Sequence, residues 1–158
     1  MMKHGGNKYQ VKVDIEKFKF RGDALGFQYF LSSVDFELMS NPKASYEHTS
    51  ALLDPTKFLK EDGTDDLPAV YKDMPIPPPP AEDATQTAQH AWATVNNSAM
   101  AHNQKREKIF QVSREAINIH LDSSLTPTWA DPAVAHHPRY FMKLMRDAYT
   151  SRSRRRSD

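Results

Sequence analysis

Histidine is the residue type of this chain best suited to bind a metal or move a proton, and seven are present in 158 residues. A helical metal site places two histidines four residues apart, and no pair here has that spacing. His136 and His137 are adjacent, so their rings would point in different directions, and both precede Pro138 as at a solvated helix start. His102 and His120 share an apolar stretch, where partly buried histidines are common. We expect no metal site and no cofactor.

Paired carboxylates are the second candidate for chemistry, because general acid–base catalysis often uses two of them. Glu61-Asp62 and Asp65-Asp66 are such pairs, but a mobile acidic loop with a glycine would neither fix their geometry nor desolvate one of them. The chain also lacks a Ser-His-Asp signature, a nucleophile elbow and a phosphate-binding glycine loop. It has no cysteine, which excludes disulfides and thiolate sites. We therefore predict that the protein is not an enzyme.

The end of the chain is basic, although the net charge is only +1, because residues 54–83 are rich in acidic side chains. Arginines that alternate with serines contact nucleic-acid phosphates without base specificity. A solvated terminus without a partner explains the same pattern equally well, and both interpretations stay open. The candidate RNA contacts are Arg152, Arg154, Arg155 and Arg156.

The elements that would position these residues belong to one domain, since 158 residues with 39% hydrophobic content suffice for one modest core. We expect a mainly α, small helical bundle over residues 9–150, interrupted by a Pro-rich acidic loop at 60–80. Residues 1–8 are predicted to be flexible, and residues 151–158 to form a disordered basic tail. No window is apolar enough for a membrane span, so we expect an intracellular protein, cytoplasmic or nuclear, with an organelle left open.

The longest element should lie between Ala81 and Leu125, which contains neither proline nor glycine and has apolar residues on steps of three and four. A single helix from Glu82 to Asp122 would be about 60 Å long, more than the width of a compact domain of this size. Asn96, Asn97, Ser98 and Asn103 favour helices poorly. We therefore predict two helices with a break between Asn96 and Asn103.

Shorter elements flank this stretch. Tyr9 to Phe20 alternates apolar and polar residues as a strand does, or forms an extended arm whose aromatic rings pack on helices. Asp23 should cap a helix that runs through Met39, Tyr46 to Leu53 should form a short helix, and Tyr140 to Tyr149 the last one. Their apolar faces should build the core and the contacts between copies. The predicted packing and assembly residues are Phe27, Phe30, Leu31, Val34, Trp92, Ile109, Phe110, Ile117, Phe141 and Leu144.

Pro68, Pro75 and the run Pro77 to Pro80 predict extended polyproline geometry in the 60–80 loop. Such a segment can serve as a ligand for an aromatic-lined groove of a partner. We favour a stiff spacer between the two halves of the chain, because this is the main use of Pro-rich linkers.

Several of these segments resemble the N-terminal part of copia-type retrotransposon Gag proteins. Phe18 to Asp23, followed by Phe27 and the helix to Leu38, is similar to the opening apolar-x-Gly-Asp segment of that family. Trp92 and the basic and aliphatic residues of Arg106 to Leu125 resemble the family's later helix.

The segment Tyr140 to Tyr149 would match the helix that closes the Gag domain. The chain differs from the family by Phe27 in place of a tryptophan, by its long Pro-rich loop and by the absence of a Cys-rich zinc knuckle. The resemblance therefore implies a capsid-like, self-associating protein more than one that packages RNA.

Two functions from different classes follow. The first is a non-enzymatic, Gag-like assembly protein that forms homo-oligomers through apolar helix faces, with weak RNA contact by the tail. The alternative is an accessory subunit wrapped on a larger ribonucleoprotein or organelle complex, for which the extended arm, the proline linker and the basic tail would be suited. Neither requires a membrane.

Overall fold

The computed structural model describes the backbone of residues 19–157 and the side chains of residues 19–150. This part of the chain is mainly α-helical, as the sequence predicts, and it contains two isolated β-bridges but no strand. Residues 1–8, predicted to be flexible, and the strand or arm predicted for Tyr9 to Phe20 lie outside the described residues, apart from Lys19 and Phe20. In chain order the elements are α2 (Ala24–Ser40), α3 (Tyr46–Leu53), η1 (Ala69–Tyr71), α4 (Gln86–Ile119), η2 (Ser123–Ala130) and α5 (Pro138–Ser157).

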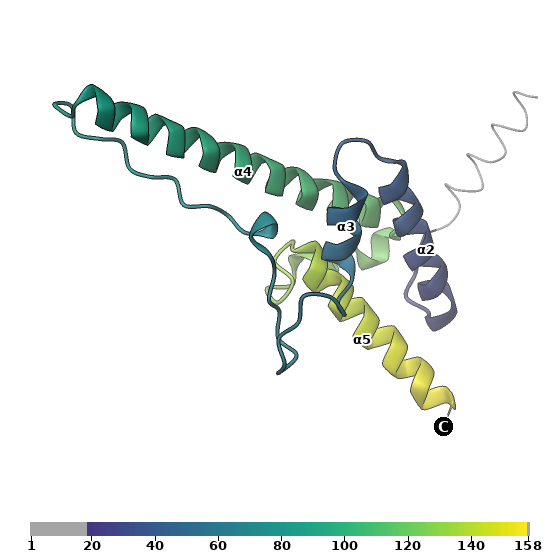
Figure 1. The fold of residues 1–158 in the computed structure, drawn as a ribbon. Coiled ribbons are helices and arrows are strands. Elements are labelled where there is room, and N and C mark those ends of the chain that lie inside the picture. The colour runs from purple at the N-terminus through teal and green to yellow at the C-terminus, as the bar shows by residue number, and fades with distance from the viewer. Residues whose placement is uncertain (1–18, 158) are drawn as a thin grey trace, which may run out of the picture.

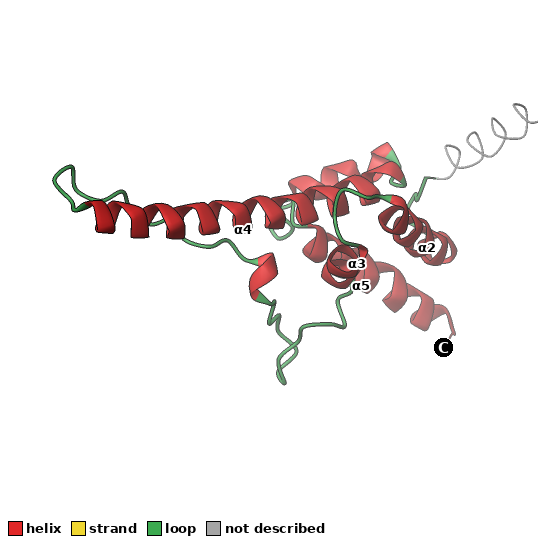
Figure 2. Ribbon diagram, turned by 45° about the horizontal axis from the view of Figure 1, so that its top comes forward, coloured by secondary structure: helices red, strands yellow, loops and turns green. Residues whose placement is uncertain are grey.

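The elements form a packed head from which half of one helix projects (Figure 1). α2, α3 and α5 pack around the C-terminal half of α4, while its N-terminal half extends away from them (Figure 2). The chain between η1 and α4 runs back along this projecting half. We call residues 72–103 the arm, residues 72–80 within it the strap, and the remainder of the described chain the head.

α4 is one continuous helix, so the predicted break between Asn96 and Asn103 is wrong. Its 34 residues correspond to roughly 50 Å. The length argument for a break assumed that the whole helix lies within a compact domain, whereas half of it projects. The helix also begins later than predicted, because the Thr85 side chain accepts a hydrogen bond from the Ala88 N–H at 3.1 Å and caps it.

The ends of α2 and α3 agree with the sequence. The Asp23 carboxylate accepts a hydrogen bond from the Gly26 N–H at 2.9 Å and caps α2, as predicted. Gly22, one residue earlier, has a φ of +96°, and a Cβ there would lie 2.6 Å from the Tyr149 hydroxyl oxygen. A side chain at residue 22 would therefore be strained by its backbone and would clash with α5.

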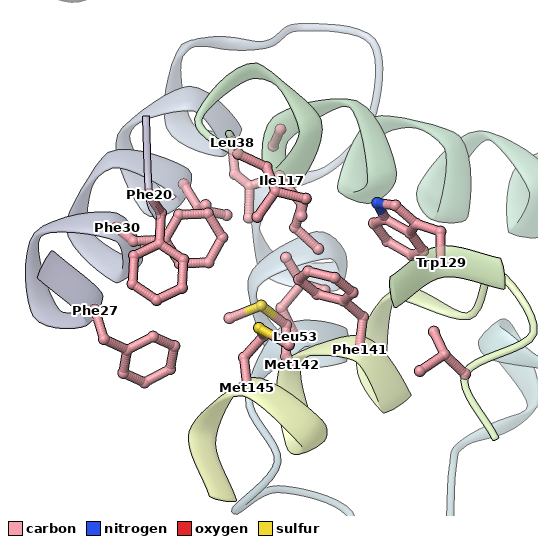
Figure 3. Close-up of a cluster of buried hydrophobic side chains, with 14 of the residues drawn as sticks. Phe20, Phe27, Phe30, Leu38, Leu53, Ile117, Trp129, Phe141, Met142 and Met145 are labelled. Carbon is pink, nitrogen blue, oxygen red and sulfur yellow. The ribbon is translucent and has the colours of Figure 1, made fainter. Parts of the chain in front are cut away.

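The main core of the head combines stacked aromatic rings with aliphatic and methionine side chains (Figure 3). Phe20 stacks on Phe30 at 4.9 Å between ring centroids and forms a T-shaped pair with Tyr149 at 5.0 Å. Trp129 stacks on Phe141 at 4.4 Å. Phe20 also forms a parallel bridge with Leu121, so the chain before α2 is tied to the chain after α4.

A second, smaller core cluster joins α3, η1 and α4. It contains Leu52, Tyr71, Ile109 and Phe110. The Tyr71 hydroxyl donates a hydrogen bond to the His48 carbonyl at 2.8 Å, and burial raises the pKa of Tyr71 to about 12. The 60–80 segment, predicted to be an exposed loop, thus contributes one of its side chains to the interior.

α5 begins at Pro138 and its backbone is helical to Ser157. The sequence predicts a tail without regular structure from residue 151, whereas the helix continues through it. The side chains of Arg152, Arg154, Arg155 and Arg156 lie outside the described residues, so the predicted RNA contact is not placed.

Candidate functional site

Most of the predicted assembly residues pack inside the head. Phe27, Phe30, Val34, Ile109, Phe110, Ile117 and Phe141 are buried. Leu31 and Trp92 are half-buried, and Leu144 is 38% exposed. Because these buried side chains already pack inside one copy, a contact between copies needs a different apolar surface.

The outer face of α2 provides such a surface. Leu25 is 89% exposed, Tyr29 and Phe36 are 61% exposed and Met39 is 56% exposed. At 3.6 residues per turn these positions, with Ser32 among them, fall within about 80° of the helix circumference, opposite the side that faces the core. We call Leu25, Tyr29, Ser32, Phe36 and Met39 the α2 stripe. α2 is therefore apolar on two opposite faces, although a helix on the surface of a monomer usually has one apolar face.

A buried cation, which the sequence did not reveal, lies beneath α5. Arg139 is fully buried, and its guanidinium donates to the carbonyls of Leu52, Asp54 and Lys57 at 3.3, 2.9 and 2.5 Å. It also donates to the Asp65 carboxylate through two nitrogens, at 3.1 and 3.0 Å. Each of the three guanidinium nitrogens, Nε, Nη1 and Nη2, thus has an acceptor, as a buried charge requires.

The same carboxylate accepts a hydrogen bond from the Lys143 ammonium at 2.5 Å. Burial alone would raise the pKa of Asp65, but the hydrogen bonds and charges of Arg139 and Lys143 together hold it below its ordinary value. The prediction that the acidic loop cannot hold a carboxylate in fixed geometry is wrong for Asp65. Because that carboxylate has a lowered pKa and is paired with two cations, its arrangement suits a structural anchor better than a proton carrier.

The chain around this anchor carries an unusual backbone conformation. Phe58, which follows the Lys57 carbonyl, has a φ of +58°, in a region that costs a residue with a side chain energy. Its carbonyl accepts the Asp66 N–H at 2.6 Å, which closes the acidic turn beside Arg139. The strained residue therefore lies between the carbonyls of residues 52–57 and the Asp65 carboxylate that bind the same guanidinium.

The histidines do not come together. Within residues 19–150, no three His, Asp or Glu side chains are placed to hold a metal ion. His120 lies 3.2 Å from the Glu37 carboxylate, and His102 bonds the Lys72 carbonyl at 2.8 Å. His136 stacks on Trp129, and His137 packs between two aromatic rings. His137 is thus half-buried, which corrects the prediction that both residues form a solvated helix start.

An open pocket of about 290 Å³ lies between α2, α3 and α5. The Tyr46 hydroxyl at its wall donates to the Asp35 carboxylate at 2.6 Å, and this hydrogen bond raises the pKa of Tyr46. Burial would raise the pKa of Asp54, but the hydrogen bonds of Thr56 hold it below its ordinary value. Both pKa values move away from neutrality, whereas an acid or base catalyst needs a pKa near the working pH.

Along the arm, polar side chains of α4 bind backbone groups of the strap. Asn103 accepts the Met74 N–H at 2.6 Å and donates to the Met74 carbonyl at 2.9 Å. Trp92 Nε1 donates to the Pro77 carbonyl at 3.1 Å. Where the arm meets the head, Arg106 Nε donates to the Tyr71 carbonyl at 3.0 Å. The Pro-rich segment is therefore fixed along α4 and is not a free spacer.

Sequence reasoning missed three features: Arg139, the strap contacts and the α2 stripe. The stripe had a signal, because the spacing of Leu25, Tyr29, Phe36 and Met39 repeats on a second face of the same helix. Arg139 had none, since three of its acceptors are backbone carbonyls.

Among the helices that the structure describes, none has the length and apolar character needed to cross a membrane.

Comparisons with known proteins found no relative of this chain. No family model, no curated protein and no solved structure matches this chain.

Proposed function

We propose that this chain is a non-enzymatic, intracellular assembly protein that self-associates through the α2 stripe. The observation that supports the proposal is the exposure of Leu25, Phe36 and Met39 on a helix whose other face is already buried in the core. Full burial of such a side chain stabilises by roughly 1.5–3 kcal/mol, against which the loss of translational and rotational freedom must be set.

A second copy of the chain is the occupant that fits the stripe best. The stripe is about 20 Å long and includes no charged residue, so two stripes related by a two-fold axis would meet without repulsion. The carboxylates beside it are engaged within the molecule, Asp35 with Tyr46 and Glu37 with His120. The contact would therefore be apolar at its centre and polar at its rim, as protein interfaces are.

The resemblance to copia-type Gag proteins supports the same function, because it implies self-association through helices. It remains a proposal that rests on the segments from Phe18 to Asp23, from Arg106 to Leu125 and from Tyr140 to Tyr149. Weak RNA contact by Arg152, Arg154, Arg155 and Arg156 belongs to the same proposal.

The alternative function, an accessory subunit of a larger assembly, is favoured by the arm. A projecting helix with exposed Val95 and Met100 suits insertion between other subunits. The two functions differ in the surface they use, so single substitutions on α2 and on the arm separate them.

The test is the molar mass of the purified full-length protein by size-exclusion chromatography with light scattering, over a hundredfold range of concentration. We expect the wild-type mass to rise with concentration and Phe36→Lys to remain a monomer. Val95→Lys, a matched change of an exposed apolar residue on the arm, should associate as the wild type does.

A wild-type protein that stays monomeric up to millimolar concentration would contradict self-association. If Val95→Lys and Phe36→Lys lowered the mass equally, the contact would not be the α2 stripe. A further possibility is that residues 1–18 cover the stripe within one copy. In that case the wild type would be monomeric and Val13→Lys would increase association, which would also overturn the proposal.

A further inference from the structure

Three exposed lysines line a pocket that the assembly function does not use. The pocket has a volume of about 260 Å³ and lies between the start of α3 and the middle of α4. Lys105 and Lys108, three residues apart on α4, share one side of it. Lys43 approaches from the turn before α3, which is held by a hydrogen bond from the Lys43 N–H to Asn41 Oδ1 at 2.8 Å.

No carboxylate in the described chain neutralises these ammonium groups. Glu107, which lies between Lys105 and Lys108 in the sequence, is paired with Arg114 at 3.1 Å and with Arg106 at 3.9 Å. The ion pairs of residues 19–150 include none of the three lysines. Three like charges that share one pocket without a counter-charge repel one another, and an anion would relieve that repulsion.

The remaining wall of the pocket also favours an anion. Ser45 occupies the N-cap position of α3, but its side chain makes no capping bond, so the first backbone N–H groups of the helix are not capped by it. Glu47, on the same turn, is exposed and does not line the pocket.

We propose that this pocket binds a small anion with several phosphate groups. Phosphate oxygens carry the charge density that three lysines and a helix start would recognise. A compact anion with several phosphates matches charges gathered at one place, whereas a nucleic acid spreads single charges along its backbone. The assignment is independent of the α2 stripe, which lies on a different helix.

The test uses calorimetric titration of the full-length protein with sodium tripolyphosphate at low salt, with a single-stranded RNA oligonucleotide as the second ligand. We expect tripolyphosphate to bind with one site per chain and with an affinity that falls as salt is raised. The double variant Lys105→Gln/Lys108→Gln should bind at least tenfold more weakly. Lys60→Gln, a matched change of an exposed lysine outside the pocket, should bind within twofold of the wild type.

A tail variant in which Arg152, Arg154, Arg155 and Arg156 are all replaced by glutamine keeps this assignment separate from the tail. It should retain tripolyphosphate binding. Loss of binding in the tail variant, equal weakening by Lys60→Gln, or no measurable binding to the wild type would each overturn the proposal. Tighter binding of RNA than of tripolyphosphate, with the same dependence on Lys105 and Lys108, would overturn the assignment to a small anion.

Discussion

The two halves of α4 have the same backbone but different surroundings. In the head, Ile109, Val112, Ala116 and Ile117 are buried in the two core clusters. In the arm, Ala99 is the one α4 residue that is fully covered among those described, and α4 binds the strap there through side-chain hydrogen bonds.

The difference shows that one helix can be stabilised in two ways. The head excludes water, and burial of apolar area there contributes most of the free energy of folding. The arm remains close to solvent, where each hydrogen bond contributes only about 0.5–1.5 kcal/mol net. We therefore expect substitutions in the head to affect global unfolding, and substitutions in the arm to affect local opening.

The largest effect should come from Arg139, where polar contacts are buried as deeply as the core. Arg139→Met keeps much of the side-chain volume but leaves the Asp65 carboxylate without its main partner, so we expect a loss of about 3–5 kcal/mol in the free energy of unfolding. Urea denaturation would measure it. Arg114→Met, which removes a partly exposed ion pair with Glu107, should cost less than about 1 kcal/mol. Equal losses would contradict the assignment of Arg139 as an anchor.

A direct comparison of the two regions uses one aromatic ring from each. Phe30→Ala should lower the free energy of unfolding by about 3–5 kcal/mol, because Phe30 is fully buried among other rings. Trp92→Ala should cost about 1–2 kcal/mol, since Trp92 is half-buried and its main polar contact is one hydrogen bond to Pro77. The distinction between head and arm would fail if chemical denaturation gave similar losses for both.

The head should also differ from the arm in its dependence on pH. Burial lowers the pKa of His137 from 6.5 to about 4, so between these values the unfolded chain binds more protons than the folded one. The free energy of unfolding should therefore fall as the pH is lowered from about 6.5 to about 4. Partial exposure of the ring keeps the slope below the limit of about 1.4 kcal/mol per pH unit for one group.

His137→Phe should flatten this pH profile, because it keeps an aromatic ring against Phe110 and Tyr140 but cannot take up a proton. His136→Asn, a change at the exposed neighbour, should retain the slope. Denaturation series at several pH values would measure both. A wild-type profile that is flat between pH 4 and 6.5 would contradict the burial of a neutral imidazole.

The smallest effect is expected in the arm. Asn103→Ala removes both hydrogen bonds to Met74, so the Met74 amide should exchange its hydrogen faster while global stability changes by about 1 kcal/mol or less. Hydrogen exchange measured by NMR would detect it. Asn97→Ala, an exposed position on the same helix, should leave that amide protected. Unchanged exchange in Asn103→Ala would show that other contacts hold the strap.

Local signals explain which parts of this architecture could be predicted. The Asp23 cap and the apolar spacing from Phe27 to Leu38 act within one helix, and both α2 and α3 lie where they were expected. The break in α4 was wrongly predicted, because the propensity of Asn103 was judged without the strap that uses its amide group. Composition indicated an extended Pro-rich segment but did not indicate which surface it would lie on.

The α2 stripe and the lysine pocket could be predicted only in part, because both depend on how the helices pack. Apolar periodicity identifies helix faces, but it does not tell which of two faces of α2 the core will cover. The lysine pocket combines Lys43 with Lys105 and Lys108, residues that are distant in sequence and meet only when α3 packs on α4. No spacing rule on one element could have shown it.

The contacts of Arg139 also have a consequence for the order of folding. Its acceptors lie 74 to 87 residues earlier in the chain. During synthesis, the carbonyls of Leu52, Asp54 and Lys57 therefore remain hydrated until the start of α5 has left the ribosome. Contacts that close such long loops form slowly. A nascent chain that stops before residue 139 should accordingly be a substrate for chaperones rather than a folded intermediate.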